Sequence, residues 1–243
     1  MKKLVDCSKE EIGRIKEESL KKYNEYLGMN ISINMARGKP SPEQLDYSDN
    51  ILNLTKKELG VFSEDGTDCR NYGQLCGIPE CRRLFGELMG VPEENVIACG
   101  SSSLNLMYDY FSQCMTLGCG GCEPWMLQKN CKFIAVVPGY DRHFAIAQHF
   151  GVELLSVPMT PTGPDMDKIE ELIKDPLVKG VFCVPKYSNP DGITYSSETV
   201  ERFAALKPAA KDFRVIWDEA YIIHDLFDEQ DELANVFELA RRY

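Results

Sequence analysis

Five short apolar runs, each followed by a segment of helix or turn character, constrain the fold more than any other feature of the chain. The runs lie near residue 96, over 132–138, over 152–158, up to residue 185, and over 215–217. Strands that alternate with helices in this way predict an α/β domain with a mostly parallel sheet and right-handed crossovers. No internal repeat or low-complexity linker interrupts the pattern.

The last of these runs leads directly into acidic residues. Val215 to Trp217 is typical of the end of a buried parallel strand, and Asp218 follows where the apolar run stops. Ligands of open α/β sheets bind outside the carboxyl ends of the strands, so Asp218 is well placed for chemistry. An Asp at this position also commonly caps the next helix, and the choice between these roles depends on the other strand ends.

Three earlier strand ends also present polar or aromatic groups. Ser101 and Ser102 follow a glycine at the start of a helix, where backbone N–H groups and the helix dipole favour a phosphate. Tyr140 follows the run over 132–138, and Asn189 lies in the turn NPDG. Each residue also has a simpler interpretation, as a helix cap, as an aromatic that covers the core, or as a turn residue.

The composition limits the class of protein. With 44% apolar residues, the 243-residue chain can bury a substantial core. The net charge of -11 and the pI near 4.9 disfavour a nucleic-acid or anionic-membrane partner. No apolar run approaches the roughly eighteen residues that span a bilayer, and the N-terminal residues lack a hydrophobic signal core. We therefore expect a cytoplasmic protein whose ten cysteines are reduced.

The motif CGGC, Cys119 to Cys122, lies between Cys114 and Cys131. This spacing matches half of a zinc ribbon, but no second CxxC follows at the required distance and no histidine lies nearby. The sequence therefore favours a glycine-rich loop with incidental cysteines, and no metal site is expected.

The first part of the chain has a different character. Ser8 and Glu11 form a capping-box pattern at the start of a charged helix that extends to Leu27. In the loop that follows, Arg37 and Lys39 either bind an anion or form a solvated basic surface. No GxGxxG follows the first strand, which disfavours a nicotinamide-binding domain.

The segments GSSSLNLMYD, PGYDRHF, NPDG and DEAY, in this order, resemble the fold-type-I pyridoxal-phosphate (PLP) enzymes, and among them the class I/II aminotransferases. ARGKP and YGQLCGIPE resemble the aspartate aminotransferase subgroup, and the similarity covers nearly all of residues 36–225. The resemblance implies an α/β, PLP-dependent transferase-like large domain with a mostly parallel sheet. Residues 1–65 would form an N-terminal helix, an arm and a small-domain segment, and residues 66–243 the N-terminal part of the PLP-binding large domain.

The resemblance also implies roles for the strand-end residues, with PLP as the cofactor. Asp218 matches the carboxylate that keeps the pyridine nitrogen protonated, which strengthens PLP as an electron sink. Tyr221 and Asn189 match the pair that hydrogen-bonds the phenolic oxygen of the ring. Tyr140 matches the aromatic residue that stacks on the ring face.

Other residues match contacts to the phosphate, to a second subunit and to the substrate. Ser101 and Ser102 match the donors to the phosphate. Tyr72 matches a residue that reaches the phosphate of the neighbouring subunit, so a homodimer is implied. Gly38 corresponds to a substrate-side loop. The expected substrates are an amino acid and a 2-oxo acid, between which an amino group moves.

One essential residue of the family has no match. The lysine that forms a Schiff base with PLP and moves the proton is expected beyond DEAY, but no lysine follows Asp218. We expect a chain that is truncated before this lysine, a sheet that lacks two strands, and no turnover by the 243 residues alone. Lys186 is interpreted as a surface lysine and is not expected to substitute.

Other functions stay open on the sequence. A fragment that binds PLP without turnover is consistent with the missing lysine, and a β-lyase or decarboxylase would share the same cofactor contacts. A PLP-dependent transcription regulator would need a basic helix-turn-helix domain, which the roughly 35 residues ahead of the matched segments cannot hold.

Overall fold

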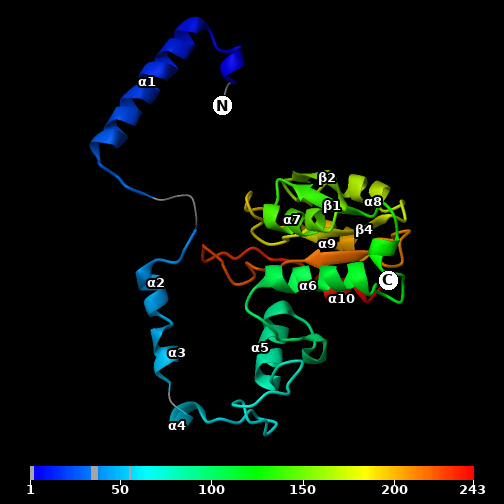
Figure 1. Cartoon of the computed structure of the whole chain (residues 1–243). Helices are drawn as coiled ribbons and strands as arrows, with labels where there is room; N and C mark the ends of the chain where they lie inside the picture. Colours follow the sequence, from blue (N-terminus) through cyan, green and yellow to red (C-terminus); the bar gives the residue numbers. More distant parts are fainter. Residues whose placement is uncertain (1–2, 34–37, 55) are drawn as a thin grey trace. The chain divides into compact units, whose positions relative to one another are not determined.

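The computed structural model describes residues 3–33, 38–54 and 56–243 (Figure 1). The chain forms two compact units, Met1–Gly60 and Val61–Tyr243. The domain boundary after residue 65 stays a prediction. Arg37, one of the two basic residues considered for anion binding, lies outside the described residues.

The first unit consists of helices without a buried core. Its elements are η1 (Leu4–Asp6), α1 (Lys9–Gly28), α2 (Pro42–Asp46), α3 (Asp49–Asn53) and α4 (Lys56–Leu59). At the start of α1 the Glu11 N–H donates to Ser8 Oγ at 3.2 Å and the Ser8 N–H to Glu11 Oε2 at 2.7 Å, which confirms the capping box. None of the side chains described in this unit is buried, and Gly38 and Lys39 are exposed.

The second unit is built on a five-stranded sheet in the order β3-β2-β1-β4-β5. The strands are β1 (Lys132–Val137), β2 (Glu153–Thr160), β3 (Gly163–Pro164), β4 (Val178–Cys183) and β5 (Arg214–Trp217). Adjacent strands are parallel except for β2 and β3, which are antiparallel. This arrangement confirms the predicted α/β fold with a mostly parallel sheet.

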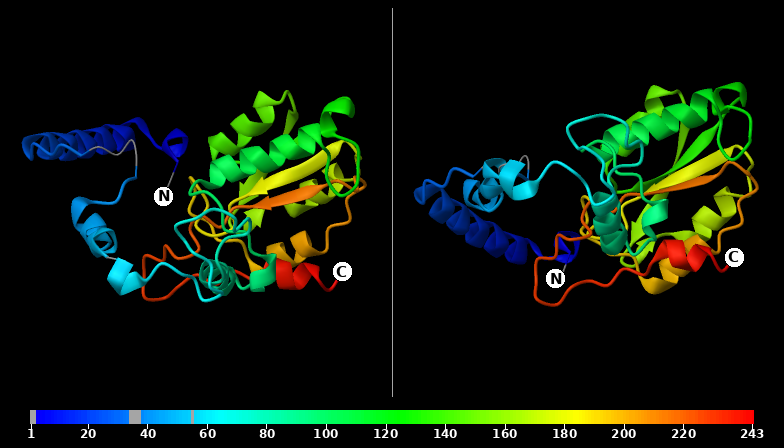
Figure 2. Two further views of the ribbon diagram at one scale, coloured as in Figure 1. Left: turned by 60° about the horizontal axis from the view of Figure 1, so that its bottom comes forward. Right: turned by 90° about the horizontal axis from the view of Figure 1, so that it is seen from below.

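Helices cover both faces of this sheet (Figure 2). The helices of this unit are α5 (Pro79–Met89), η2 (Glu93–Asn95), α6 (Ser103–Thr116), η3 (Trp125–Leu127), α7 (Asp141–His149), α8 (Met166–Leu172), α9 (Ser197–Ala204) and α10 (Val236–Ala240). α6 and α7 pack on one face, and α8 and α9 on the other. No helix in the described ranges is long and apolar enough to cross a membrane.

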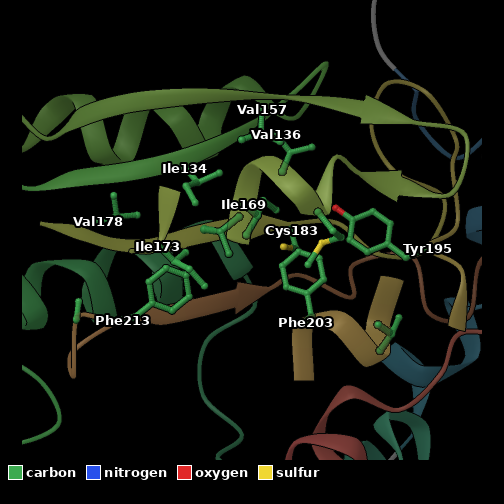
Figure 3. Packing of buried hydrophobic residues seen from close by; sticks show 14 residues of the cluster. Ile134, Val136, Val157, Ile169, Ile173, Val178, Cys183, Tyr195, Phe203 and Phe213 are labelled. Atoms are coloured by element: carbon green, nitrogen blue, oxygen red, sulfur yellow. The ribbon is translucent and has the colours of Figure 1, made fainter. Parts of the chain in front are cut away.

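The alternation of side chains along the strands divides the core into two layers. Phe133 and Phe182 point to the α6 and α7 face, where Phe111 packs edge-on against Phe133 with ring centroids 5.3 Å apart. Ile134 and Cys183, their neighbours in the chain, point to the opposite face and pack with residues of α8 and α9 (Figure 3). The strand ends therefore rest on a core that is packed from both sides.

The carboxyl ends of β1 and β4 meet at a topological switch point. The chain leaves β1 toward β2 on one side, while β4 pairs with β1 on the other side and β5 lies beyond β4. Such a switch leaves a crevice outside the strand ends. Tyr140 and Asn189 follow these two strands after a few residues, so the topology places both at this crevice.

A buried ion pair lies toward the amino ends of β4 and β5. The Lys179 ammonium lies 2.8 Å from Asp212 Oδ1, and 4% and 3% of the two side chains are exposed. Asp212 Oδ2 accepts hydrogen bonds from Trp125 Nε1 at 2.9 Å and from Gln128 Nε2 at 3.0 Å. Both oxygens of this buried carboxylate are therefore paired, as burial of a charge requires.

The strand predicted at Val96 is not formed. Residues 96–100 belong to no strand of the described structure, and the Ala98 N–H donates to the Cys76 carbonyl at 2.9 Å. A strand needs a neighbouring strand to bond to, and β5 pairs with β4 on one side only. Within the residues described, the sheet ends at β5.

Gly180 in β4 leaves no room for a side chain. A Cβ atom there would lie against the Arg214 carbonyl oxygen and 2.6 Å from the Phe133 ring. We expect Gly180→Ala to lower the free energy of unfolding by roughly 1–3 kcal/mol through overpacking, measured by chemical denaturation. Gly13→Ala is the control, because no atom lies within 4 Å of its added Cβ. Equal midpoints for Gly180→Ala and the parent would contradict this expectation.

Candidate active site

Asp218 lies at the carboxyl end of β5, as predicted. Its N–H donates to the Cys183 carbonyl at 2.8 Å, which continues the pairing of β5 with β4 by one residue. Its carboxylate is 9% exposed and lies 3.0 Å from His143 Nε2, and the His143 side chain is 2% exposed. A buried carboxylate needs such a partner, so His143 accounts for the stability of Asp218 in this position.

His143 is held from three directions. It lies in the first turn of α7, where its N–H donates to the Tyr140 carbonyl at 3.1 Å. Its ring stacks on Phe182 with centroids 5.2 Å apart, and Tyr140 packs edge-on at 5.1 Å. The ring orientation is thereby fixed with Nε2 toward Asp218. The sequence reasoning assigned His143 no role, although it follows Tyr140 by one helical turn.

Tyr140 and Asn189 lie together at the switch point. Both line a small cavity with His143, Ser188 and Tyr195, among others. Its volume is about 10 Å³, which is room for one water molecule at most. The structure therefore brings two of the predicted residues to His143, the partner of Asp218.

A larger cavity of about 560 Å³ also borders Asp218. Residues of α5, α6, α10 and the segment after β5 line it, and most of them are apolar. Among its polar lining groups are Asp218, Glu219 and Ser103. Its volume is typical of sites for small molecules, and it joins the strand-end carboxylates to the start of α6.

The start of α6 has the local structure that the sequence predicted. Gly100 has a φ of 60°, which lets the chain turn into the helix, and Ser102 Oγ accepts from the Asn105 N–H at 3.4 Å as the N-cap. Ser101 is exposed, and Ser103 reaches the cavity wall. The positive end of a 14-residue helix therefore lies at the cavity that also holds Asp218.

The second carboxylate of this cavity differs from the first in its surroundings. Burial raises the pKa of Glu219, and the hydrogen bond from Trp217 Nε1 to Glu219 Oε1, 3.0 Å long, offsets only part of that rise. Glu219 thus holds a proton more readily than an exposed Glu. Two adjacent carboxylates with different environments are suited to different tasks, one as a charge partner and one as a proton carrier.

Neither cavity is lined by five of the predicted residues, which are Ser101, Ser102, Tyr221, Tyr72 and Gly38. Tyr221 is half-buried and packs edge-on against His224 with ring centroids 5.9 Å apart. Tyr72 is 97% exposed, and Gly38 belongs to the first unit. Their roles stay predictions.

Lys186 differs from its expected surface position. Only 8% of its side chain is exposed, and its ammonium lies 2.8 Å from Asp225 Oδ1. The interpretation as a surface lysine is therefore wrong. The reason is that Asp225, distant in the chain, returns to the end of β4 and neutralises the charge there.

The cysteines around CGGC lie at the other end of the sheet, near Asp212. Cys119 Sγ donates to the Asp212 carbonyl at 3.6 Å, and burial raises the pKa of the Cys114 thiol to about 12. In the part of the chain that the structure describes, no group of three or more His, Cys, Asp or Glu side chains is arranged to hold a metal ion.

Nearly the whole chain matches a known protein family. The model described as aspartate amino-transferase matches residues 7–243. The chain belongs to the aspartate amino-transferase family. This result confirms the resemblance that the strand-end motifs indicated and the PLP-transferase-like fold class that it implied.

Individual relatives agree with this assignment. An aspartate aminotransferase from Corynebacterium glutamicum is 46% identical over 235 residues, which are 96% of this chain and 54% of the relative. A crystal structure of an aspartate transaminase from the same species has a TM-score of 0.87 at 45% identity, and the match covers 98% of this chain and 56% of the other. The chain therefore spans about half the length of these relatives.

A more distant structure shares the fold. It is an α-aminoadipate aminotransferase from Thermus thermophilus, complexed with N-(5'-phosphopyridoxyl)-L-leucine. The TM-score is 0.62 at 21% identity, over 85% of this chain and 48% of that one. At this identity the likeness concerns the fold alone.

Proposed function

We propose that the protein acts in PLP-dependent transfer of an amino group between an amino acid and a 2-oxo acid. The observation behind this proposal is Asp218, which is buried beside His143 and lines the same cavity as Ser103 at the start of α6. Family membership supports the reaction type. The spacing of a carboxylate and a helix N-terminus across one cavity supports a ligand with a cationic ring and a phosphate.

The donor set fits PLP. The start of α6, with Ser101 and Ser102, offers N–H and hydroxyl donors to the phosphate. Asp218 offers a carboxylate whose orientation His143 fixes, and such a group favours a protonated pyridine nitrogen. Tyr140 lies edge-on to His143, where its ring would border the cofactor ring.

The remaining roles follow from the family pattern. Asn189 and Tyr221 would donate to the phenolic oxygen of the ring, and Gly38 would lie on the substrate side. When bound, PLP supplies the electron sink for the reaction, and this chain's residues position it and hold its charges. Glu219, with its raised pKa, is suited to hold a proton beside Asp218.

We further propose a homodimer in the cytoplasm. The exposed ring of Tyr72 supports a contact across subunits, because a side chain that is 97% exposed is free to reach a second chain. All ten cysteines are free thiols in the structure, which supports a reducing compartment.

A second function has an observation of its own. No lysine follows Asp218 in the sequence, and the ammonium of Lys186 is paired with Asp225. An amine held by the Asp225 carboxylate and the Ile222 carbonyl is not positioned to attack an aldehyde. We therefore propose that these 243 residues bind PLP without turnover.

The proposed function is tested by titrating the purified chain with PLP and with pyridoxal while recording the absorbance spectrum. We expect saturable binding of PLP and a lower affinity for pyridoxal, which lacks the phosphate. Inorganic phosphate should compete with PLP. Equal affinities for PLP and pyridoxal, or no saturable binding of PLP, would contradict the proposal.

A further inference from the structure

Three side chains, Lys186, Tyr187 and Asp225, form a polar cluster beyond the carboxyl end of β4. We refer to them as the Lys186 cluster. Asp225 Oδ1 accepts from the Tyr187 hydroxyl at 2.6 Å and lies 2.8 Å from the Lys186 ammonium. The ammonium also lies 5.1 Å from the centre of the Tyr187 ring. One carboxylate oxygen therefore joins two neighbouring residues of the β4 end.

The same cluster bonds to the backbone of the segment after β5. The Lys186 ammonium donates to the Ile222 carbonyl at 3.2 Å, and the Asp231 N–H donates to the Tyr187 hydroxyl at 3.3 Å. Figure 2 shows this segment, in orange to red, leaving the end of β5 and returning toward α10. The segment is thus bonded to residues that follow β4 at two points, Ile222 and Asp231.

Apolar packing contributes little to holding the middle of this segment, before Leu233 and Ala234 pack against the core. Leu226 is 85% exposed and Phe227 is 81% exposed, although both are large apolar residues. By contrast, only 8% of the Lys186 side chain and 14% of the Asp225 side chain are exposed. A segment with few buried apolar contacts opens at low free energy unless polar contacts hold it. Residues 222–231 are therefore held mainly by the buried contacts of the Lys186 cluster, together with the hydrogen bond from Thr194 Oγ1 to Asp231 Oδ2.

The restrained segment also forms a wall of the large cavity. Ile222, Ile223 and His224 line that cavity together with Asp218. Lys186 contacts the backbone of Ile222 directly and reaches Asp225 on the far side of these residues. Displacement of Lys186 would therefore release the wall beside Asp218.

We propose that Lys186 is a positioning residue, which fixes residues 221–225 as a wall of the Asp218 cavity through Asp225 and the Ile222 carbonyl. Its effect on PLP rests on the proposed function. The hydrogen bonds from Lys186 and then from Tyr187 lower the pKa of the Asp225 carboxyl, which keeps Asp225 ionised at neutral pH. Asp225 is therefore available as a charge partner for Lys186 around neutral pH.

Amide hydrogen exchange of the chain without PLP tests this role. Lys186→Met and Asp225→Asn should each raise exchange in peptides covering 221–231 by roughly tenfold or more, because each removes a charged hydrogen bond. Peptides of β1 should be unchanged. The double variant should raise exchange by less than the two single effects combined, since both remove the contact between Lys186 and Asp225. Lys186→Arg, which keeps the charge, should restore most of the protection.

Lys174→Met is the matched control, because Lys174 forms an exposed ion pair with Glu171. It should leave exchange in 221–231 unchanged. Exchange within twofold of the parent in Lys186→Met, or an equal rise over the whole second unit, would overturn the positioning role. Additive effects of the two replacements would overturn it as well.

A PLP titration of the same variants separates this inference from the proposed function. If the parent binds PLP, Lys186→Met should bind it roughly tenfold more weakly while Lys174→Met does not. Faster exchange with unchanged PLP affinity would overturn the claim that the segment positions the site. If the parent itself does not bind PLP, the proposed function fails, and the exchange data still decide whether Lys186 holds the segment.

Discussion

Lys179→Met is expected to lower the free energy of unfolding by about 3–5 kcal/mol, because it leaves the Asp212 carboxylate buried without its charge partner. The ammonium of Lys179 lies 2.8 Å from Asp212 Oδ1, and neither side chain has more than 4% exposure. Trp125 and Gln128 still donate to Asp212 Oδ2, but two neutral donors do not neutralise a charge in the core. Urea denaturation followed by tryptophan fluorescence measures the effect.

Two variants serve as controls for this experiment. Lys174→Met removes an exposed ion pair and should change the free energy of unfolding by no more than about 0.5 kcal/mol. Combining Lys179→Met with Asp212→Leu removes both charges and should recover much of the lost stability. A Lys179→Met midpoint equal to that of the parent would show that the pair is not needed.

The difference in stability between the parent and Lys179→Met should depend on pH in a definite direction. Burial alone would raise the pKa of Asp212, but the hydrogen bonds from Lys179 and Gln128 outweigh burial and lower it below the ordinary value of 3.8. The pair therefore stabilises the fold above about pH 3.8, and this contribution is lost as the pH falls through the lowered pKa of the folded state. The difference in the free energy of unfolding between the parent and Lys179→Met should become smaller below that pH.

Asp218→Ala is expected to weaken PLP binding by a factor of roughly 30 or more, since loss of one partner of a buried charge pair costs about 2–5 kcal/mol. Binding of inorganic phosphate should be unchanged, because the start of α6 is intact. In a lysine-complete relative of the same family, the corresponding change should remove most transamination. The measurement is the PLP absorbance titration, with near-ultraviolet circular dichroism to show that the core is still packed.

Asp109→Ala is the matched control for this replacement. Asp109 is an exposed residue of α6, so the change removes an equal charge without touching the Asp218 cavity. Its PLP affinity should equal that of the parent. Equal affinities in Asp218→Ala and Asp109→Ala would remove Asp218 from the proposed site.

Local pattern and sheet geometry were sufficient to predict where several candidate site residues lie in the fold. The apolar run before Asp218 forms β5, and Asp218 and Tyr140 lie beyond the carboxyl ends of β5 and β1, as predicted. Ser102 was predicted as a possible cap because the preceding glycine and the following helix are neighbours in sequence. These features are determined mainly by residues that are neighbours in the sequence.

The features that were missed depend on contacts between distant segments. His143 faces Asp218 only because α7 packs beside Phe182 at a particular rotation, which no local pattern specifies. Lys186 is buried because Asp225 returns to it across nearly forty intervening residues. Val96 has a strand-like sequence, but a strand also needs a bonding neighbour.

The direction of the parallel strands separates two kinds of mutational damage. Lys179 and Asp212 lie toward the amino ends of β4 and β5, whereas Tyr140 and Asp218 lie beyond the carboxyl ends of β1 and β5. Replacements at the first end should act through the fraction of unfolded chain, so in a cell they reduce the amount of protein that escapes proteolysis. Replacements at the second end should alter what each molecule can bind, and exposed residues there should do so with little effect on protein abundance. A screen that measures protein abundance and ligand binding separately should find that variants at the amino ends of the strands lower abundance, whereas variants at the carboxyl ends lower ligand binding.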